Sequence, residues 1–330
     1  MDPDTVQGDP QAPSQRVGCV DVVIVSADMA EMTLACVEHL ADASVADVVV
    51  IDNAFAPEAG AARAALRERA TVLALDFPHG FAAANNRGLA LGQAPYALLL
   101  NSDILTVPGA IDALLAALDG NPGAVAAGGR LVDPDTLVTQ EGYRPRPFPG
   151  VVNFLVIVLG IEEWWPGNPV SRRYHGSRVA DTHVQAVAQP AAAALMVRRS
   201  DMAAVGGFDE RFWFWFEDSD LLLRLSARGD VLYVPQAVFR HLGGGTFSRW
   251  SKSERIRSAH HGMLHFADAH LPRLHRAVLG VVVLLISAPR IALFHRSRPA
   301  EARAWRAVAS GGLALVRGGR VPVIAPGPPA

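Results

Sequence analysis

Short apolar runs alternate with amphipathic stretches over the first hundred residues of the chain. Residues 20–26 (VDVVIVS) are apolar and β-branched, as in a buried strand, and the apolar positions Leu34, Val37 and Leu40 that follow have helical spacing. Further runs of strand type, separated by helical patterns, lie at residues 47–54, 71–77 and 96–103. This alternation predicts an α/β domain: a Rossmann-like, mostly parallel sheet with helices on both faces.

The second part of the chain continues the alternation with less regular spacing. Its predicted elements are a helix at 111–118, a strand at 124–132, a Pro-rich loop at 143–150, a strand at 191–199, a short helix and turn at 200–212, a helix at 218–229 and a strand that ends near His241. We expect these elements to complete the same domain. Residues 246–320 are basic and amphipathic and predict a C-terminal helical appendage.

Three of the predicted strands end in polar residues. They are Ser26 in the first strand, Asp52 and Asn53 in the second, and Asn-Ser-Asp at 101–103 in the fourth. In parallel α/β sheets, ligands bind beyond the carboxyl ends of the strands. We therefore expect a ligand-binding cleft along this edge.

An aromatic run leads directly into three acids at residues 212–220 (FWFWFEDSD). A carboxylate held against apolar rings loses hydration, so Glu217, Asp218 and Asp220 need a partner or a wet cleft. The pattern that follows places them in a first helical turn, where the helix dipole favours negative charge. Taken singly, each polar signal also has a structural explanation: a turn cap for residues 101–103, a helix N-terminus for the acids, and a structural histidine for His241.

Composition narrows the class of protein. The chain has 330 residues, half of them hydrophobic, and a formal net charge of −2, so we expect a globular protein without a general attraction to nucleic acid. Its two cysteines, Cys19 and Cys36, cannot form a disulfide framework and fit a reducing, cytoplasmic compartment. Residues 1–19 are expected to form a loose tail and not a secretory signal, and residues 321–330 are also expected to be disordered.

Two apolar runs raise the question of a membrane. Residues 151–161 and 278–288 each fall well short of the ~20 apolar residues that span a bilayer. The first is expected to be a buried helix. The second lies among arginines, so packing in the fold and lying on anionic lipid as an interfacial helix are equally good interpretations.

Two smaller features lie in the same region. His261 and His265 are four residues apart, as in some metal sites, but without a third ligand we expect a solvated helix face. Residues 243–250 (GGGTFSRW) are a candidate loop for closing over a bound donor.

Six segments together resemble family 2 glycosyltransferases of the GT-A fold, closest to the rhamnosyltransferase-like members that build bacterial cell-surface polysaccharides. The matching segments are VDVVIVS, VVVIDNA, GFAAANNRGLALG, YALLLNSD, GGFDERFWFWFEDSDLLLRLSARG and VLYVPQAVFRHLGG. They span about residues 20–245. The resemblance divides this span into a nucleotide-binding half at 20–107 and an acceptor and catalytic half at 108–245.

The resemblance implies roles for residues along the predicted cleft. Asp52 would accept a hydrogen bond from the nucleobase, and Asp103, the acid of the DXD-like element, would hold Mg²⁺ or Mn²⁺ against the donor diphosphate. His241 matches a position that helps to bind metal or diphosphate in some relatives. The other residues expected near the nucleotide are Ser26, Asn53, Asn85, Asn86, Arg87, Asn101 and Ser102. Because Asn101 replaces the first acid of the strict motif, weak metal binding is expected.

For catalysis, the resemblance implies one displacement that inverts the sugar configuration. Asp218, paired with Glu217, would be the general base that deprotonates the acceptor hydroxyl, with a pKa raised by partial burial beside the aromatic rings. Trp213, Trp215 and Phe216 would form the acceptor surface. The implied donor is a nucleotide-sugar, with dTDP-rhamnose favoured, and the implied acceptor is a glycan or a lipid-linked sugar. We expect a cytoplasmic protein, or one peripheral on the inner face of the plasma membrane, as a monomer or an oligomer.

Two other functions are compatible with the pattern. The turn after the first strand (VSADMA, 25–30) and the residues after Asp52 (NAFAPEAG, 53–60) depart from the family pattern, which would suit a non-catalytic binding or scaffold subunit. The third hypothesis is a glycoside hydrolase that uses two of the acids and needs no nucleotide.

Overall fold

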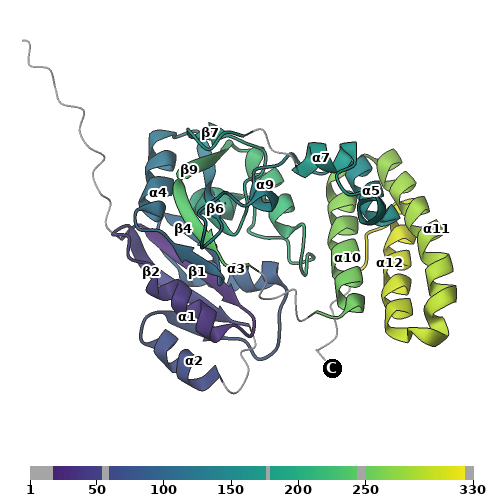
Figure 1. Ribbon diagram of the computed structural model, residues 1–330, viewed down its shortest axis with the longest axis horizontal. Helices are drawn as coiled ribbons and strands as arrows, with labels where there is room; N and C mark the ends of the chain where they lie inside the picture. The colour runs from purple at the N-terminus through teal and green to yellow at the C-terminus, as the bar shows by residue number, and fades with distance from the viewer. Residues whose placement is uncertain (1–17, 54–58, 176–178, 244–249, 324–330) are drawn as a thin grey trace, which may run out of the picture.

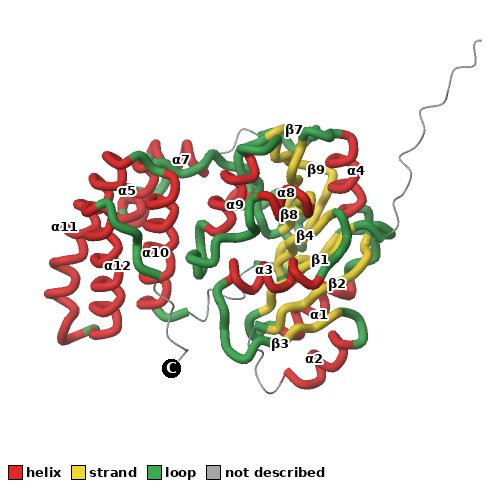
Figure 2. Tube along the Cα trace, turned by 180° about the vertical axis from the view of Figure 1, so that it is seen from behind, coloured by secondary structure: helices red, strands yellow, loops and turns green. Residues whose placement is uncertain are grey.

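The computed structural model describes residues 18–53, 59–175, 179–243 and 250–323 (Figure 1). Two parts lie side by side: a twisted sheet with helices on both faces, and a group of long helices formed mainly by the C-terminal region (Figures 1 and 2). The predicted terminal tails, apart from their innermost residues, lie outside the described residues. So do positions 54–58 after Asp52 and positions 244–249 of the candidate closing loop.

One sheet runs through the first part in the strand order β3-β2-β1-β4-β8-β6-β9-β5, and β7 pairs with β9. The strands are β1 (Val20–Ser26), β2 (Val45–Asp52), β3 (Thr71–Ala74), β4 (Tyr96–Asn101), β5 (Ile104–Thr106), β6 (Ala124–Val132), β7 (Gln185–Ala186), β8 (Ala194–Arg198) and β9 (Asp230–His241). Strands β1 to β4 are parallel, whereas β8 runs antiparallel to both β4 and β6. The predicted α/β fold with a central, mostly parallel sheet is confirmed.

The helices divide between the two parts. Around the sheet lie α1 (Ala30–Glu38), α2 (Gly60–Arg67), α3 (Phe81–Leu91), α4 (Ala110–Gly120), α8 (Arg199–Ala204) and α9 (Glu217–Ser226). The remaining helices are α5 (Val151–Leu159), α6 (Ile161–Trp164), α7 (Pro169–His175), α10 (Lys252–His270), α11 (Arg273–Ser297) and α12 (Pro299–Arg317), and Glu141–Tyr143 forms a short 3-10 helix.

Strand β1 explains why helices cover both faces of the sheet. All its residues are buried, and alternate side chains point to opposite faces. Val22 and Ile24 share a hydrophobic cluster with side chains of α1, α2 and α4, whereas Val23 shares one with α3, α8 and α9. A strand that is covered twice has no position for an exposed polar side chain, so its sequence is mostly apolar, and its one charged residue, Asp21, is buried and paired with Arg199.

Several predicted boundaries shift in the structure. The strands predicted at 20–26 and 124–132 are correct at both ends, but the strand predicted at 71–77 ends at Ala74. The strand predicted at 96–103 ends at Asn101, after which the chain turns through Ser102 and Asp103 into β5. Strand β5 pairs antiparallel with the end of β9, so that Ile104 lies opposite His241. The turn therefore brings Asp103 next to His241.

The helical part has a hydrophobic core of its own. Phe154 and Val158 of α5 pack with side chains of α10, α11 and α12, so residues from before and after the boundary predicted at 246 share this core. Helices α11 and α12 approach closely: a Cβ on Gly280 would lie 2.5 Å from the backbone oxygen of Gly312. Phe212, the first residue of the aromatic run, also belongs to this cluster and connects the two parts.

Two predictions for this part need correction. His261 and His265 were expected on a solvated face, but both are buried, with their Nε2 atoms 3.1 Å apart, and His261 Nε2 lies 2.8 Å from the Pro322 carbonyl oxygen. The terminal segment that follows α12 covers this face of α10, which local periodicity could not reveal. The apolar run at 278–288 is part of a longer helix, α11, whose 25 residues are long and apolar enough to cross a membrane by length and composition.

The run at 151–161 forms a helix as expected. It is half-buried, since Val152 and Leu159 are exposed while Phe154, Val156 and Val158 are covered.

Candidate active site

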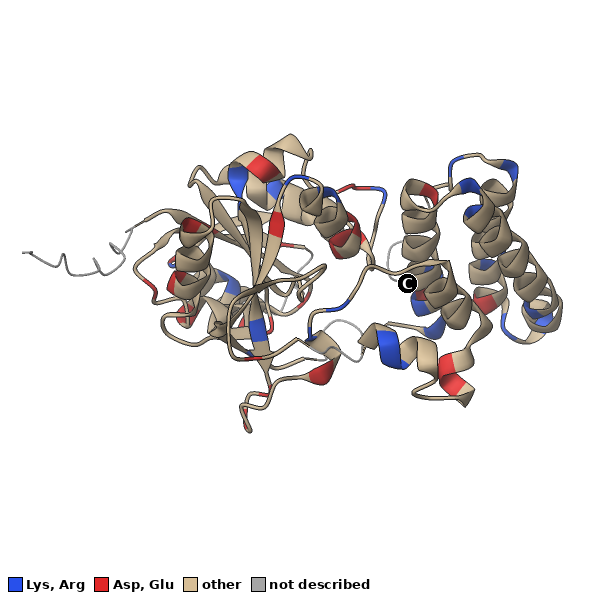
Figure 3. Ribbon diagram, turned by 90° about the horizontal axis from the view of Figure 1, so that it is seen from above, with Lys and Arg blue, Asp and Glu red and all other residues tan. Residues whose placement is uncertain are grey.

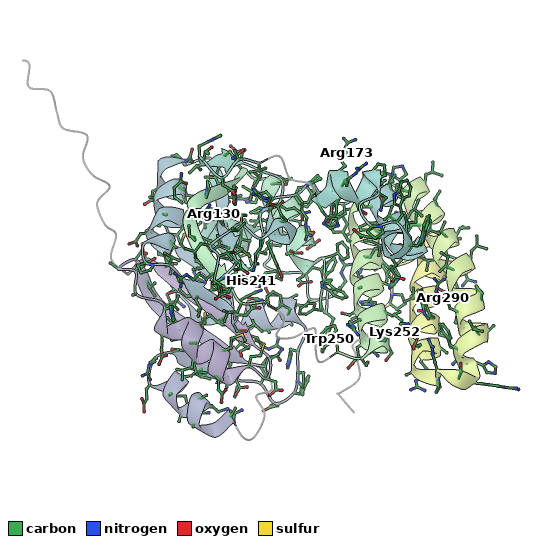
Figure 4. All side chains as sticks on the ribbon, in the orientation of Figure 1. Arg130, Arg173, His241, Trp250, Lys252 and Arg290 are labelled. Atoms are coloured by element: carbon green, nitrogen blue, oxygen red, sulfur yellow. The ribbon has the colours of Figure 1, made fainter. Side chains whose placement is uncertain are left out.

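A cavity of about 1250 Å³ opens between the carboxyl edge of the parallel strands and helices α5, α7 and α10. Two of its residues are labelled in Figure 4: His241 at the end of β9 and Trp250 just before α10. The predicted site residues in its wall are Asn53, Asn101, Ser102, Asp103, Trp213, Trp215, Phe216, Glu217, Asp218 and His241. Segments far apart in the sequence thus meet at one opening.

Asp103 and His241 form one end of the cavity. The His241 Nε2 atom lies 3.4 Å from the Asp103 carboxylate. On the other side of the ring, Nδ1 lies 2.8 Å from the side-chain oxygen of Gln140, and Gln140 Nε2 donates a hydrogen bond to the His241 carbonyl oxygen. An Nδ1–H that donates to Gln140 leaves the Nε2 lone pair directed towards Asp103. Tyr143 packs edge-on against the His241 ring, with 4.4 Å between ring centroids.

This pair fits part of a divalent cation site. Within the described residues, no group of three or more His, Cys, Asp and Glu side chains has an arrangement that could hold a metal ion. A carboxylate and a neutral imidazole nitrogen can supply two ligands, and Mg²⁺ or Mn²⁺ commonly completes its shell with substrate phosphate oxygens and water. Asp103 and His241 are therefore suitable to hold a cation together with a bound diphosphate.

The three acids at the other end of the cavity have different surroundings. Glu217 is buried, whereas the Asp218 side chain is 29% exposed and lines the cavity. Asp220 is buried and structural: its carboxylate pairs with Arg224 and accepts a hydrogen bond from His270 Nε2 at 2.7 Å, which ties α9 to α10. Of the three acids, Asp218 presents the most exposed side chain to the cavity, whose wall also includes Glu217.

Burial has a clear effect on the pKa of Glu217. Burial raises its pKa to about 8, and the neighbouring Asp218 carboxylate adds to this shift. One of its carboxylate oxygens, Oε2, is buried and has no hydrogen-bond partner within the described chain. A protonated Glu217 satisfies this environment better than a charged one, because no Lys, Arg or His in the described part of the chain forms an ion pair with it.

The backbone is strained in the two residues that precede these acids. Trp215 and Phe216 have φ angles of 70° and 68°, a left-handed conformation that bulky residues rarely adopt. Two glycines hold the loop in place. A Cβ on Gly80 would lie 2.9 Å from the Trp213 backbone, and one on Gly262 of α10 would lie 2.2 Å from the Trp215 carbonyl oxygen. The strained turn is thus clamped between α3 and α10, which aims Asp218 into the cavity.

Five residues predicted near the nucleotide do not line this cavity: Ser26, Asp52, Asn85, Asn86 and Arg87. Asp52 is buried with its carboxylate 2.8 Å from Arg63 of α2, and the Ser26 hydroxyl is hydrogen-bonded to Thr33. Both asparagines and Arg87 bond backbone carbonyl oxygens, and Asn86 braces the turn at Phe208. The structure gives these side chains internal partners, and their contact with nucleotide stays a prediction.

Sequence patterns missed several residues of the cavity wall. The Pro-rich loop, expected only as an irregular connection, contributes Tyr143, Arg144 and Arg146, and α7 contributes Tyr174. Arg146 approaches one of the predicted site residues, since its Nη2 atom lies 4.0 Å from Oδ2 of Asp218. Two arginines among prolines were the available signal, but nothing local connects them with an acid 72 positions later.

The comparisons with known proteins agree with this geometry. Residues 21–168 match the family model "Glycosyl transferase family 2", and residues 186–243 match "N-terminal domain of galactosyltransferase". Over 179 residues the chain is 35% identical to an N-acetylglucosaminyl-diphospho-decaprenol L-rhamnosyltransferase of Mycobacterium tuberculosis, found in two strains. The match covers 53% of this chain and 56% of that protein, so the chain spans about half the length of the curated relatives it matches.

Solved structures with the same fold include two glycosyltransferases. The mannosyltransferase PcManGT from Pyrobaculum calidifontis, in complex with GDP-Man and Mn²⁺, has a TM-score of 0.53 and 17% identity, covering 96% of this chain and 89% of its own. GalNAc-T7 with UDP, GalNAc and Mn²⁺ has a TM-score of 0.52 and 14% identity, covering 69% of this chain and 44% of its own. At these identities the likeness shows the fold, which is GT-A.

Proposed function

The chain carries a glycosyltransferase family 2 domain with the GT-A fold, and from that premise we propose that it transfers a sugar from a nucleotide-sugar to a lipid-linked acceptor. The observation that carries the proposal is that Asp103 and His241 share one cavity with Asp218. The first two suit a cation with diphosphate, and the last suits a base. A glycosyltransferase needs both at one opening.

Asp218 is the proposed general base. Its carboxylate reaches the cavity, and the N–H of Ser219 donates a hydrogen bond to Oδ1 at 2.7 Å, which orients the group and leaves Oδ2 directed towards a ligand. An acceptor hydroxyl held there loses its proton to Asp218 as its oxygen attacks the anomeric carbon on the side opposite the leaving group, so the configuration inverts. Glu217, held neutral by burial, adds no second negative charge at the attacking oxygen.

Asp103 and His241 are proposed to bind the donor diphosphate through a divalent cation. When bound, this ion would neutralise negative charge on the departing nucleoside diphosphate. Gln140 holds the His241 ring in its orientation. The nucleoside would lie against Asn53, Asn101 and Ser102 along the strand ends.

For the donor we propose dTDP-rhamnose, and for the acceptor a diphospho-lipid-linked sugar. The support is the rhamnosyltransferase with 35% identity, whose name describes transfer of L-rhamnose to an N-acetylglucosaminyl-diphospho-decaprenol acceptor. The aromatic side chains Trp213, Trp215 and Phe216 in the cavity wall offer flat faces to a sugar or a prenyl chain.

Helix α11 has features that would suit contact with a membrane, where a lipid-linked acceptor resides. Leu274, Leu285 and Leu293 are each about 70% exposed on this helix, and only 22% of its most apolar window is buried. Residues 271–330 contain nine arginines and one acid, hence a formal charge of +8 in a chain whose total is −2. Basic residues lie on the outer helices of this part (Figure 3). We propose that α11 lies on an anionic membrane surface at the cytoplasmic side.

Two measurements test the proposed function. Thermal-shift titration with dTDP, UDP and GDP, each with and without Mn²⁺, should give a Mn²⁺-dependent rise in Tm with dTDP. Incubation with dTDP-rhamnose and a short-chain N-acetylglucosaminyl-diphospho-prenol should then form a rhamnosylated product. Nucleotide binding without any transfer would favour a scaffold subunit, and glycan cleavage in the presence of chelator would favour a hydrolase.

Vesicle cosedimentation tests the membrane contact. The protein should bind vesicles rich in phosphatidylglycerol and not vesicles of phosphatidylcholine, and Leu285→Asp should weaken that binding. Val138→Asp changes an equally exposed side chain in the sheet part and serves as the matched control. Equal binding by both variants would remove α11 from the proposal.

A further inference from the structure

The Pro-rich loop at 143–150 connects the two ends of the cavity. Its first residue, Tyr143, packs against His241 at the Asp103 end, and three residues later Arg146 approaches Asp218. Both side chains line the cavity wall. One short segment thus contacts both the proposed donor end and the proposed base.

Hydrogen bonds fix the backbone of Arg146 relative to the base. Its N–H donates to the Gln189 carbonyl oxygen at 3.0 Å, and the Gln189 side chain donates back to the Pro147 carbonyl oxygen at 2.6 Å. The same side chain accepts a hydrogen bond from the hydroxyl of Ser219, the neighbour of Asp218, at 2.8 Å. Gln189 and Ser219 are both buried. This chain of bonds holds the start of the Arg146 side chain at a set distance from Asp218.

The guanidinium group itself keeps its hydrogen-bonding capacity. It lies 4.0 Å from the Asp218 carboxylate, which is beyond hydrogen-bond distance, and 5.5 Å from the centroid of the Tyr174 ring. Within the described residues, none of its five N–H donors has a hydrogen-bond acceptor. The side chain is one-third exposed, on the cavity side. A ligand with paired oxygens could accept two parallel hydrogen bonds from it.

The second arginine of the loop differs in this respect. Arg144 is neutralised by Glu141 at 2.8 Å and by Asp181 at 3.1 Å. Two carboxylates of the protein balance the charge of Arg144. The guanidinium of Arg146, in contrast, faces the cavity beside the carboxylate of Asp218. The contrast between the two indicates a ligand for Arg146.

We propose that Arg146 binds the diphosphate of the lipid-linked acceptor, an inference that rests on the proposed function. An anionic acceptor brought to Asp218 is repelled by that carboxylate unless a cation stands beside it. The planar guanidinium matches phosphate oxygens in a two-bond geometry. An acceptor sugar with one hydroxyl at Asp218 carries its anomeric diphosphate across the ring, where Arg146 is within reach. The donor diphosphate belongs to the opposite end, at Asp103.

The test compares two acceptors that differ in the diphosphate. One is geranyl-diphospho-N-acetylglucosamine, and the other is octyl N-acetylglucosaminide, which has no phosphate. Arg146→Gln should raise KM for the first about 10- to 100-fold, as expected for lost hydrogen bonds to a charged group, and leave KM for the second within about threefold. Arg146→Lys should recover part of the loss. Arg173→Gln changes an exposed arginine of α7 and is the matched control (Figure 4).

Two outcomes would overturn the inference. Equal losses on both acceptors, with a shifted pH profile of kcat, would mean that Arg146 positions Asp218 and does not bind phosphate. Absence of calorimetric binding of geranyl-diphospho-N-acetylglucosamine to the wild-type protein would also overturn it.

The same experiments distinguish a wrong proposed function from a wrong assignment of Arg146. If the wild-type protein binds the diphosphate probe in an Arg146-dependent manner but transfers no sugar to any acceptor, the transferase activity is wrong and the diphosphate site stands. If it glycosylates the octyl glycoside but does not bind the probe, the transferase activity stands and the site is wrong.

Discussion

The two ends of the cavity are built in different ways. Asp103 and His241 stand on strand ends that pair with each other, since Ile104 lies opposite His241, and Gln140 fixes the ring. Asp218 follows a turn in which Trp215 and Phe216 both have left-handed backbone conformations. The first end is made from relaxed sheet geometry and the second from a strained loop held by its neighbours.

This difference suggests a division of tasks. A cation site can be completed by substrate oxygens and water, so two side chains on a rigid edge suffice. A base has to meet one hydroxyl in one direction, and small displacements are costly in rate. Packing from α3 and α10 supplies that precision at the Asp218 end. Variants at the two ends should therefore affect different measurements.

The largest effect is expected from Asp218→Asn. Loss of a general base should lower kcat by about 10²- to 10⁴-fold, while the Mn²⁺-dependent thermal shift with nucleotide stays unchanged because the Asp103 end is intact. Steady-state kinetics with the diphospho-lipid acceptor measure the first, and thermal shift measures the second. Asp230→Asn, at an exposed acid, is the control. Turnover near the wild-type rate would remove Asp218 from the mechanism.

Gln140→Leu tests the opposite end. Without Gln140 the His241 ring loses the partner that sets its orientation, and Mn²⁺ affinity in the presence of nucleotide should fall about 10- to 100-fold. The readout is the Mn²⁺ concentration needed for half of the thermal shift. Gln236→Leu, at an exposed glutamine of β9, should leave that concentration unchanged. An unchanged midpoint in Gln140→Leu would show that His241 takes no part in holding the cation.

Gly262→Ala should damage the strained turn specifically. The added methyl group would lie 2.2 Å from the Trp215 carbonyl oxygen, so either α10 or the turn must move, at a cost of about 1–3 kcal/mol. We expect a lower unfolding free energy and a reduced kcat, with nucleotide binding preserved. Gly120→Ala, where the methyl group meets open space at the end of α4, provides the comparison. Full activity in Gly262→Ala would mean that the turn does not aim the base.

Glu217→Gln should have the smallest effect on kcat, because Gln resembles the protonated acid, and it should change how stability depends on pH. In the folded chain Glu217 keeps its proton up to about pH 8, whereas in the unfolded chain it ionises near the ordinary pKa of 4.5. Wild-type stability should therefore fall as pH rises between these values, by at most about 1.4 kcal/mol per pH unit from this group. Gln does not titrate, so its advantage in Tm should grow from pH 5 to pH 8 and then level off.

Exposed Glu31→Gln should show no such trend in Tm. A constant Tm difference between Glu217→Gln and wild type over this range would mean that Glu217 is charged in the fold.

Local periodicity was sufficient for much of this fold. The runs at 20–26 and 124–132 became β1 and β6 at both boundaries, because a strand covered on both faces is mostly apolar. Asp103, Asp218 and His241, which the family resemblance singled out, line one cavity, and their roles stay predictions. These residues stand at element ends, where a change from apolar to polar is visible in the sequence.

Other features depend on which elements become neighbours. Asp52 ends a strand as predicted, but its carboxylate meets Arg63 of α2. His261 and His265 have the spacing of an exposed face and are buried because the segment after α12 covers them. Arg146 reaches Asp218 through a loop whose path follows from its bonds to Gln189.

The chain's own pattern determined the alternating elements, the polar strand ends and the acids after the aromatic run, because each of these reflects burial with a short period along the backbone. The partners of Asp52, the burial of the two histidines and the position of Arg146 were set by folding. Contacts between distant segments depend on how whole helices and strands pack, and no local spacing encodes that packing.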